Sequence, residues 1–198
     1  SAASDVYKRQ IDTHCHIDFE DYNNDRTDVI KRAKEKLDAV INSGTNLEGN
    51  QTVLNLSKEN EGFIYPTFGF HPVTSQECTA EELHEAQKHL IDNIDDIVAI
   101  GEVGMDFFYV KDKSLRARQK EIFTRFIEIA NDYKVPLLMH VRDCEKKALN
   151  LINEYEDLPY AVFHCFSGSL KTAKRIMEHD NYYMSFSTML CYSQRHQE

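Results

Sequence analysis

The sequence predicts an α/β fold, an incomplete TIM-type (β/α) barrel with about seven of its eight strands present. Short apolar runs alternate with longer amphipathic segments along the chain, which indicates a parallel sheet covered by helices. Polar residues stand near the C-terminal ends of these runs, where a barrel collects its functional groups. No glycine-rich dinucleotide fingerprint follows the first run, which disfavours a doubly wound sheet.

The strands are predicted from nearly continuous apolar runs, as expected for parallel strands that are buried on both faces. The run VPLLMHV is typical, with a single histidine close to its end. The expected strands cover residues 10–16, 38–42, 64–70, 97–103, 135–141, 160–166 and 182–187.

The helices are predicted from capping signals and from helical spacing of apolar residues. Thr79 and Glu82 form a capping box for a helix that continues to about Asn93. A second helix is expected where apolar residues recur on one face with charges between them; these are Leu115, Ile122, Phe126, Ile129 and Tyr133. Weaker patterns lie at 26–37, 49–60, 143–156 and 169–179.

The length of 198 residues predicts a single domain, with the barrel over residues 11–187. Residues 1–10 do not continue into the strand pattern, and we expect them to be a non-native or disordered leader. Residues 188–198 are expected to be a tail outside the barrel pattern. No apolar run approaches the length of a membrane span.

The composition constrains the function and the location. The net charge of −10 argues against a broad phosphate-binding face, so any contact with nucleic acid should be local, where bound cations supply positive charge. The five cysteines are unevenly spaced and include no CxxC pair. They indicate reduced thiols and a cytoplasmic location.

Histidines and one glutamate end several predicted strands. His14 and His16 share a strand face, while Glu102, His140 and His164 each follow an apolar run. In a barrel these strand ends meet at one mouth, where imidazoles and a carboxylate form a ligand set for Zn, Mn, Fe or Co. A carboxylate has two oxygens, so Glu102 can bridge two ions. The competing interpretation is a group of separate core histidines, each bonded to a backbone carbonyl.

Other polar residues near these strand ends are secondary candidates. His71, Asp106 and Arg142 lie on the same side of the predicted barrel, and Arg142 can meet a phosphate bidentately. Each can instead be a loop residue bonded to its neighbours. Asp12 is expected to be buried behind the histidines, where it orients a ligand without binding an ion. The aromatic residues of 107–109 either stack on a splayed base or pack against the barrel rim.

Five segments together resemble the TatD family of metal-dependent deoxyribonucleases. They are DTHCH at 12–16, GFHP at 69–72, GEVGMDFFY at 101–109, VPLLMHVRD at 135–143 and FHCFSGS at 163–169. The resemblance implies a cytoplasmic hydrolase that holds two divalent ions (Zn, Mg, Mn or Co) and cleaves the phosphodiester bonds of DNA, often from exposed ends.

The resemblance also implies roles for individual residues. His14, His16 and Glu102 would hold one ion, and Glu102, His140 and His164 the other. Glu102 and Arg142 would be catalytic, and His71, Asp106 and Arg142 would line the substrate cleft.

The family's aspartate at the end of strand eight, in a T-D-S/A-P context, has no counterpart here. The resemblance therefore implies a chain truncated at its C-terminus and impaired in hydrolysis. Two alternatives remain open at this point. The metal site can serve an amide or ester hydrolase (a deacylase), or the chain can be an inactive, incomplete protein that binds metal weakly.

Overall fold

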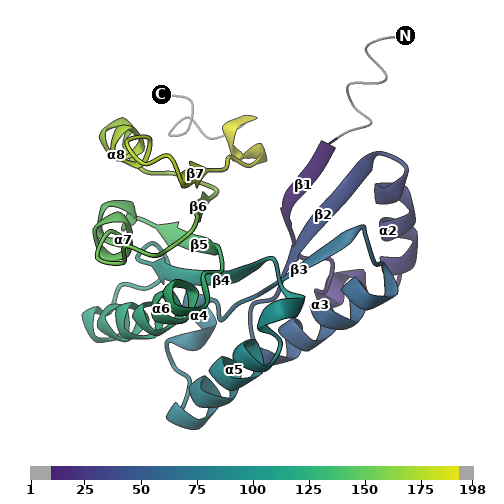
Figure 1. Ribbon diagram of the computed structural model, residues 1–198, viewed down its shortest axis with the longest axis horizontal. Helices are drawn as coiled ribbons and strands as arrows, with labels where there is room; N and C mark the ends of the chain where they lie inside the picture. Colours follow the sequence, from purple (N-terminus) through teal and green to yellow (C-terminus); the bar gives the residue numbers. More distant parts are fainter. Residues whose placement is uncertain (1–9, 192–198) are drawn as a thin grey trace.

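The computed structural model describes residues 10–191 and confirms the α/β fold, as a curled, partial barrel of seven parallel strands. Each strand is hydrogen-bonded to the next in chain order, from β1 at one end of the curl to β7 at the other (Figure 1). The strands are β1 (Gln10–Cys15), β2 (Leu37–Ser43), β3 (Ile64–Phe68), β4 (Ala99–Asp106), β5 (Leu137–Arg142), β6 (Ala161–His164) and β7 (Tyr182–Met184).

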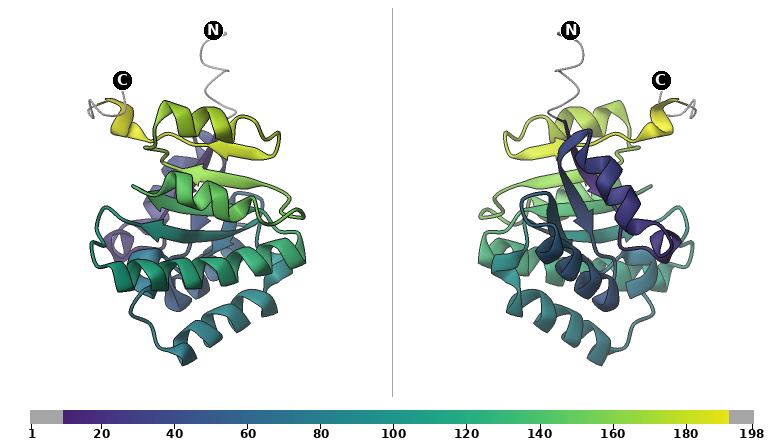
Figure 2. Two further views of the ribbon diagram at one scale, coloured as in Figure 1. Left: turned by 90° about the vertical axis from the view of Figure 1, so that its left-hand side faces the viewer. Right: turned by 90° about the vertical axis from the view of Figure 1, so that its right-hand side faces the viewer.

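The helices lie on the outer side of the curled sheet, and α6, α7 and α8 are stacked one above another beside β4 to β7 (Figure 2). They are α2 (Arg26–Lys34), α3 (Leu47–Glu59), α4 (Pro72–Ser75), α5 (Ala80–Asp92), α6 (Lys113–Tyr133), α7 (Glu145–Ile152) and α8 (Leu170–Ile176). Three short 3-10 turns, η2 (Glu20–Tyr22), η3 (Ile94–Asp96) and η4 (Thr188–Cys191), complete the described elements.

The capping box predicted at the start of α5 is present. The Thr79 hydroxyl accepts the Glu82 N–H at 3.1 Å, and the Glu82 carboxylate accepts the Thr79 N–H at 2.8 Å. The short helix α4 was not predicted. It begins at Pro72, whose fixed φ suits the first turn of a helix, directly after His71.

The expected leader and tail fall mostly outside the described residues. Residues 1–9 and 192–198 are not described, whereas Gln10 is the first residue of β1 and Thr188–Cys191 form η4. Among the helices of residues 10–191, none has the length and apolarity that a membrane span requires.

The main core lies between the outer face of the sheet and helices α5, α6 and α7. Three of the residues from α6 that build it, Phe123, Phe126 and Ile127, are at most 1% exposed. Of the predicted stripe on this helix, Ile122, Phe126 and Ile129 are buried, but Tyr133, its last residue, is 47% exposed. The core therefore fixes β4 and β5, the two strands that position the centre of the functional site.

Strand β4 extends further than the sequence predicts, to Asp106. It pairs with β5 as far as Asp106 opposite Arg142, so Glu102 lies within the strand and not at its end. Gly104 directly follows the predicted end of the strand and interrupts the apolar pattern there, which hides this continuation. It has a φ of +149°, and a Cβ there would lie 2.0 Å from the His140 carbonyl oxygen.

We predict that Gly104→Ala destabilises the fold by roughly 3 kcal/mol or more, since backbone strain adds to a clash with the β5 backbone. Gly62→Ala is the matched control, because Gly62 also has a positive φ of +75° but has nothing within 4 Å of its Cβ position. The Gly62→Ala substitution should lower the free energy of unfolding by only about 1 kcal/mol. Urea unfolding measures both, and equal losses would contradict the close approach at Gly104.

Candidate metal centre

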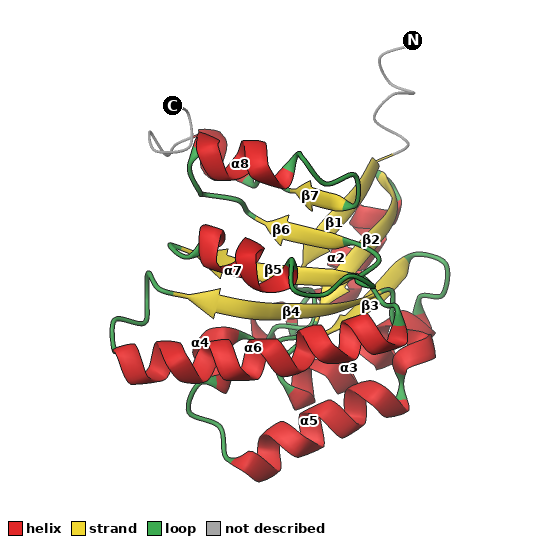
Figure 3. Cartoon of the chain, turned by 60° about the vertical axis from the view of Figure 1, so that its left-hand side comes forward, coloured by secondary structure: helices red, strands yellow, loops and turns green. Residues whose placement is uncertain are grey.

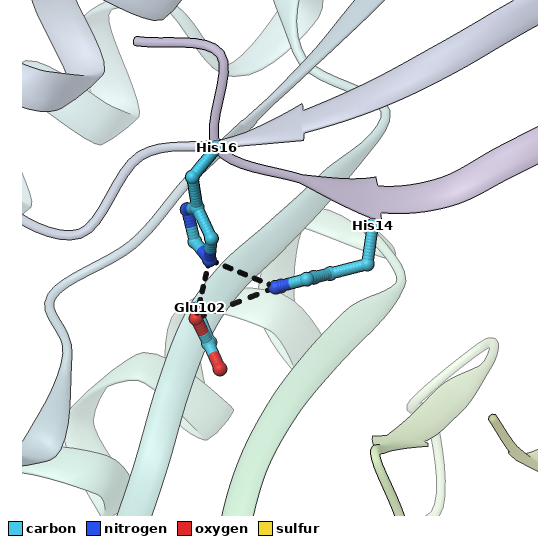
Figure 4. A group of neighbouring side chains, drawn as sticks. All are labelled: His14, His16 and Glu102. Atoms are coloured by element: carbon cyan, nitrogen blue, oxygen red, sulfur yellow. Dashed lines mark hydrogen bonds and ion pairs between the residues drawn. The ribbon is translucent and has the colours of Figure 1, made fainter. Parts of the chain in front are cut away.

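Glu102, near the middle of β4, is the centre of a cluster of imidazoles. Only 3% of this residue is exposed. Its Oε2 lies 3.6 Å from Nε2 of His14 and 3.3 Å from Nε2 of His16 (Figure 4), and its Oε1 lies 2.9 Å from Nδ1 of His140. One carboxylate thus joins strands β1, β4 and β5, and its two oxygens face different histidines.

The geometry of His14, His16 and Glu102 fits a divalent cation. Their nearest ligand atoms are separated by 3.0, 3.3 and 3.6 Å. Ligands held about 2.1 Å from a tetrahedral ion lie about 3.4 Å apart, so an ion among these three atoms needs little rearrangement. The Nε2 atoms of His14 and His16 lie within hydrogen-bonding distance of each other, so both rings present a nitrogen to the same point beside Glu102.

Ser43 fixes the other ring nitrogens of this pair. Nδ1 of His16 donates to the Ser43 carbonyl at 2.8 Å, and the Ser43 hydroxyl lies 3.3 Å from Nδ1 of His14. A carbonyl oxygen can only accept, so His16 carries a proton on Nδ1 and presents Nε2 to the centre. The sequence analysis missed Ser43, although a polar residue at the end of the second apolar run is the same signal that marks His164.

The loop after β1 is held by two further side chains that the sequence analysis missed. The Asn42 amide, fully buried, accepts the Ile17 N–H at 2.6 Å and donates to Asp18 at 3.1 Å. The Arg26 guanidinium donates to the carbonyls of Ile17, Asp18 and Phe19. These bonds fix the backbone around His16, and the Phe19 ring stacks on the His16 imidazole with centroids 4.5 Å apart.

His140 lies between two carboxylates. Its Nδ1 is 2.9 Å from Glu102, and its Nε2 is 2.9 Å from Asp106. Burial opposes a charge on this ring, but the hydrogen bonds to Asp106 and Glu102 outweigh burial and raise the pKa of His140 to about 9. The ring is therefore an imidazolium at neutral pH when no metal is bound.

The pKa values of His14, His16 and Glu102 are also shifted from their usual values. Burial lowers the pKa of His14 to about 3, although Glu102 opposes this shift. Burial also acts against a charge on His16, yet the hydrogen bond to Glu102 raises the pKa of that ring. Burial would raise the pKa of Glu102, but hydrogen bonds from His140 and His16 hold it well below its usual value. Glu102 is therefore an anion among a mixture of neutral and charged imidazoles.

His164 and His71 contact different histidines of the cluster. The His164 ring stacks on the His14 ring with centroids 3.6 Å apart, and the His71 ring meets the His140 ring edge-on at 4.4 Å. The ligand atoms of His71, Glu102 and His140 form the second compact group among the described residues. The structure therefore brings His71, expected in a substrate cleft, closer to the metal centre than the sequence suggests.

Two expected placements differ from the structure. Asp12 is exposed, not buried, because β1 has only β2 as a neighbour in the described sheet; its carboxylate accepts the His14 N–H at 3.2 Å. Asp106 is fully buried instead of facing a cleft, and it bonds to His140 and to the Tyr109 N–H. Asp106 therefore orients the His140 ring by its bond to Nε2, whereas Asp12 bonds only to the backbone N–H of His14.

Arg142 ends β5 beside this centre, and its guanidinium lies over two aromatic rings. The Cζ atom is 3.9 Å from the centroid of Phe108 and 5.1 Å from that of Tyr109. Within the described chain no carboxylate forms an ion pair with Arg142. Its N–H donors are thus available to an anion.

The chain matches known proteins over most of its length. A family model described as TatD related DNase matches residues 11–198. An uncharacterized metal-dependent hydrolase of Methanocaldococcus jannaschii is 35% identical over 191 residues, which are 96% of this chain and 72% of that protein. The human protein named deoxyribonuclease TATDN3 is 27% identical over 167 residues, which are 80% of this chain and 61% of that protein.

The fold also matches a solved structure. The crystal structure of YjjV, a TatD homolog from Escherichia coli K12, superposes with a TM-score of 0.77 at 29% identity. The match covers 88% of this chain and 66% of that one, so the chain spans about two thirds of the length of this relative.

We predict that metal uptake by the metal-free protein releases protons at pH 7, because Nδ1 of His140 must lose its proton before it can bind an ion and its pKa is about 9. Metal affinity should therefore rise as the pH increases from 7 to 9. Titration calorimetry in two buffers with different heats of ionisation measures the release; identical heats would contradict it.

Asp106→Asn should reduce this proton release, since it removes one of the two carboxylates that raise the His140 pKa. Asp95→Asn, at an exposed aspartate remote from the centre, is the control and should release as many protons as the wild type. In the metal-free protein, the stabilising effect of the charged His140 is complete below pH 6.5 and is lost as the pH rises through about 9. Thermal unfolding at pH 6 and pH 10 measures that loss.

Proposed function

Because the chain belongs to the family of TatD-related DNases, which are metal-dependent hydrolases, we propose that it cleaves phosphodiester bonds at single-stranded DNA ends with the help of two divalent ions. The human relative named a deoxyribonuclease supports DNA as the substrate. We also propose a cytoplasmic location, because the five cysteines are unevenly spaced and include no CxxC pair.

The observation that carries this proposal is the division of the two Glu102 oxygens between two sets of imidazoles. Oε2 faces His14 and His16, and Oε1 faces His140. A carboxylate placed this way can bridge two ions about 3.5–4 Å apart, the spacing of two-metal phosphodiesterases. His14, His16 and Glu102 would hold one ion, and Glu102 and His140 would hold the other.

The third histidine of the second ion follows from the ring nitrogens. Nδ1 of His71 accepts the Val73 N–H at 3.3 Å, and burial lowers the pKa of His71 to about 4. The neutral ring then carries its proton on Nε2, which makes it a donor to substrate. Nδ1 of His164 lies 3.4 Å from the Ser185 hydroxyl, which can donate to it or accept from it. Its Nε2 can therefore offer a lone pair, and we propose His164 as the ligand.

The remaining residues bind and orient the substrate. When bound, the two ions lower the pKa of a water and polarise a phosphoryl oxygen. Arg142, held against Phe108 and Tyr109, donates N–H groups to a phosphate oxygen and offsets the charge that develops in the transition state. Nε2 of His71 donates a hydrogen bond from the opposite side. Asp106 holds the His140 ring in place through Nε2.

Metal removal should abolish hydrolysis of a single-stranded DNA oligonucleotide, and Zn, Mn, Mg or Co should restore it. Glu102→Gln should lower kcat/KM by about 100-fold or more, since one neutral amide replaces the bridging anion. The panel should include an RNA oligonucleotide and a small acyl ester. Equal DNA hydrolysis in chelator would contradict the proposal, and turnover of the acyl ester alone would assign a deacylase.

The ligand assignment is tested by counting bound ions. His164→Ala should reduce the bound metal from two ions to one, whereas His71→Ala should keep both ions and raise KM for DNA. His84→Ala, at an exposed histidine on α5, is the control and should change neither quantity. Elemental analysis and steady-state kinetics provide the numbers. Loss of an ion from His71→Ala with retention of both in His164→Ala would reverse the assignment.

A further inference from the structure

A basic groove lined by residues of α6 and α7 lies outside the metal centre. Figure 3 shows these two helices as neighbours on the outer side of the sheet. Its volume is about 550 Å³, and Met105, Phe107 and Leu151 form its apolar part. None of the histidines and carboxylates of the metal centre lines it. The groove is therefore separate from the metal centre. The two sites are connected only through strand β4 and the loop that follows it.

The groove concentrates positive charge in a chain whose net charge is −10. Lys113, Arg116 and Lys120 of α6 and Lys147 of α7 line it, against a single carboxylate, Glu154. In the described part of the chain, none of the three lysines forms an ion pair. Like charges gathered in this way repel one another, and an anion in the groove would remove that repulsion.

One of the cations is already fixed in position. The Arg116 guanidinium donates to the carbonyls of Val110 and Phe107 at 2.7 and 2.8 Å, and it lies 4.5 Å from the centre of the Phe107 ring. The Lys147 ammonium lies 5.0 Å from the same ring. The wall of the groove is thus preorganised, so a ligand would pay little ordering entropy there.

Cations and aromatic rings alternate from the groove to the metal centre. Phe107 lies under Arg116 and Lys147, and the next two residues, Phe108 and Tyr109, are 39% and 65% exposed beside Arg142. Proteins that bind single strands combine a basic path for the backbone with rings on which bases stack. A small anion would not need the exposed rings, and a membrane surface would need a broad basic face.

The loop that carries these rings is tied to the metal centre by one carboxylate. Asp106 accepts the Tyr109 N–H at 2.7 Å on Oδ1 and bonds Nε2 of His140 at 2.9 Å on Oδ2. The Asp106 N–H in turn donates to Gln119 of α6 at 3.0 Å. These bonds fix the groove, the rings and the metal centre relative to one another.

We propose that the groove between α6 and α7 binds the phosphate backbone of a single nucleic-acid strand whose end reaches the metal centre across Phe108 and Tyr109. The proposal rests on the proposed nuclease function and adds to it a second contact, several nucleotides from the bond that is cleaved. It makes a long strand a better ligand than a short one. Lys113, Lys120 and Lys147 supply the charge.

The test measures binding of labelled oligodeoxythymidylates of 3 and 12 nucleotides to the full chain by fluorescence anisotropy, in chelator, so that no cleavage occurs. The variant carries Lys113→Glu, Lys120→Glu and Lys147→Glu. The control carries Lys31→Glu, Lys36→Glu and Lys58→Glu, at exposed lysines of α2, of the turn after it and of α3, and has the same net charge.

The groove variant should bind the 12-mer at least 10-fold more weakly than the control variant does. The slope of log affinity against log salt should fall by about 2, from three lost contacts at roughly 0.7 each. The difference for the 3-mer should be below 2-fold. A triple Lys→Gln variant, which adds no repulsion, should show a smaller loss of the same kind, and circular dichroism melts confirm that all variants are folded.

Two results would overturn the proposal. One is an equal loss in the groove and control variants, which would show that only the net charge matters. The other is displacement of the 12-mer by a polyglutamate peptide as readily as by unlabelled DNA, which would show a general anion site. Hydrolysis is assayed separately with metal added. An absence of hydrolysis with intact groove-dependent binding would refute the proposed function and leave the strand site standing.

Discussion

Glu102 imposes the main constraint on this structure, since a carboxylate that is 3% exposed must be matched by partners. The chain supplies them from distant positions: His14 and His16 from the first strand and the loop after it, and His140 from the fifth strand. The parallel order of the sheet makes this convergence possible, because equivalent positions of neighbouring strands lie side by side. The core packed by α6 against β4 then keeps the carboxylate in place.

The same constraint explains why the centre suits cations. Two imidazoles with Nε2 atoms 3.0 Å apart, facing one carboxylate oxygen, present three ligand atoms to one point, which suits a divalent ion. A ligand that binds the folded state and not the unfolded one stabilises the fold by mass action. Much of the polar organisation around the centre, from Ser43 to Asp106, aims ring nitrogens inward and so prepares the site before an ion arrives.

The fold and the convergence of His14, His16 and His140 on Glu102 could be predicted from the sequence, because buried parallel strands are continuous apolar runs and their ends are marked by single polar residues. All seven strands are present near their expected positions. The extent of β4 could not be predicted, since Gly104 and the buried Asp106 depart from its apolar pattern beyond Val103. The roles of Asn42 and Arg26 could not be predicted either. Both side chains bind backbone groups of another segment, and such contacts leave no pattern in the local sequence. Asp12 was expected to be buried because it precedes the candidate ligands His14 and His16 on one strand face, but β1 has only β2 as a neighbour in the described sheet and the side chain is exposed.

An acidic chain was expected to meet nucleic acid only locally, and the groove between α6 and α7 is such a local patch of positive charge. The loop between this patch and the metal centre depends on Asp106, which has one charge and two oxygens, one for each neighbour. Displacing this side chain removes one hydrogen bond from the aromatic loop and one from the His140 ring together, while Arg116 still binds the loop and Glu102 still binds the ring. The position of the aromatic rings and the orientation of the His140 imidazole are therefore coupled through one carboxylate.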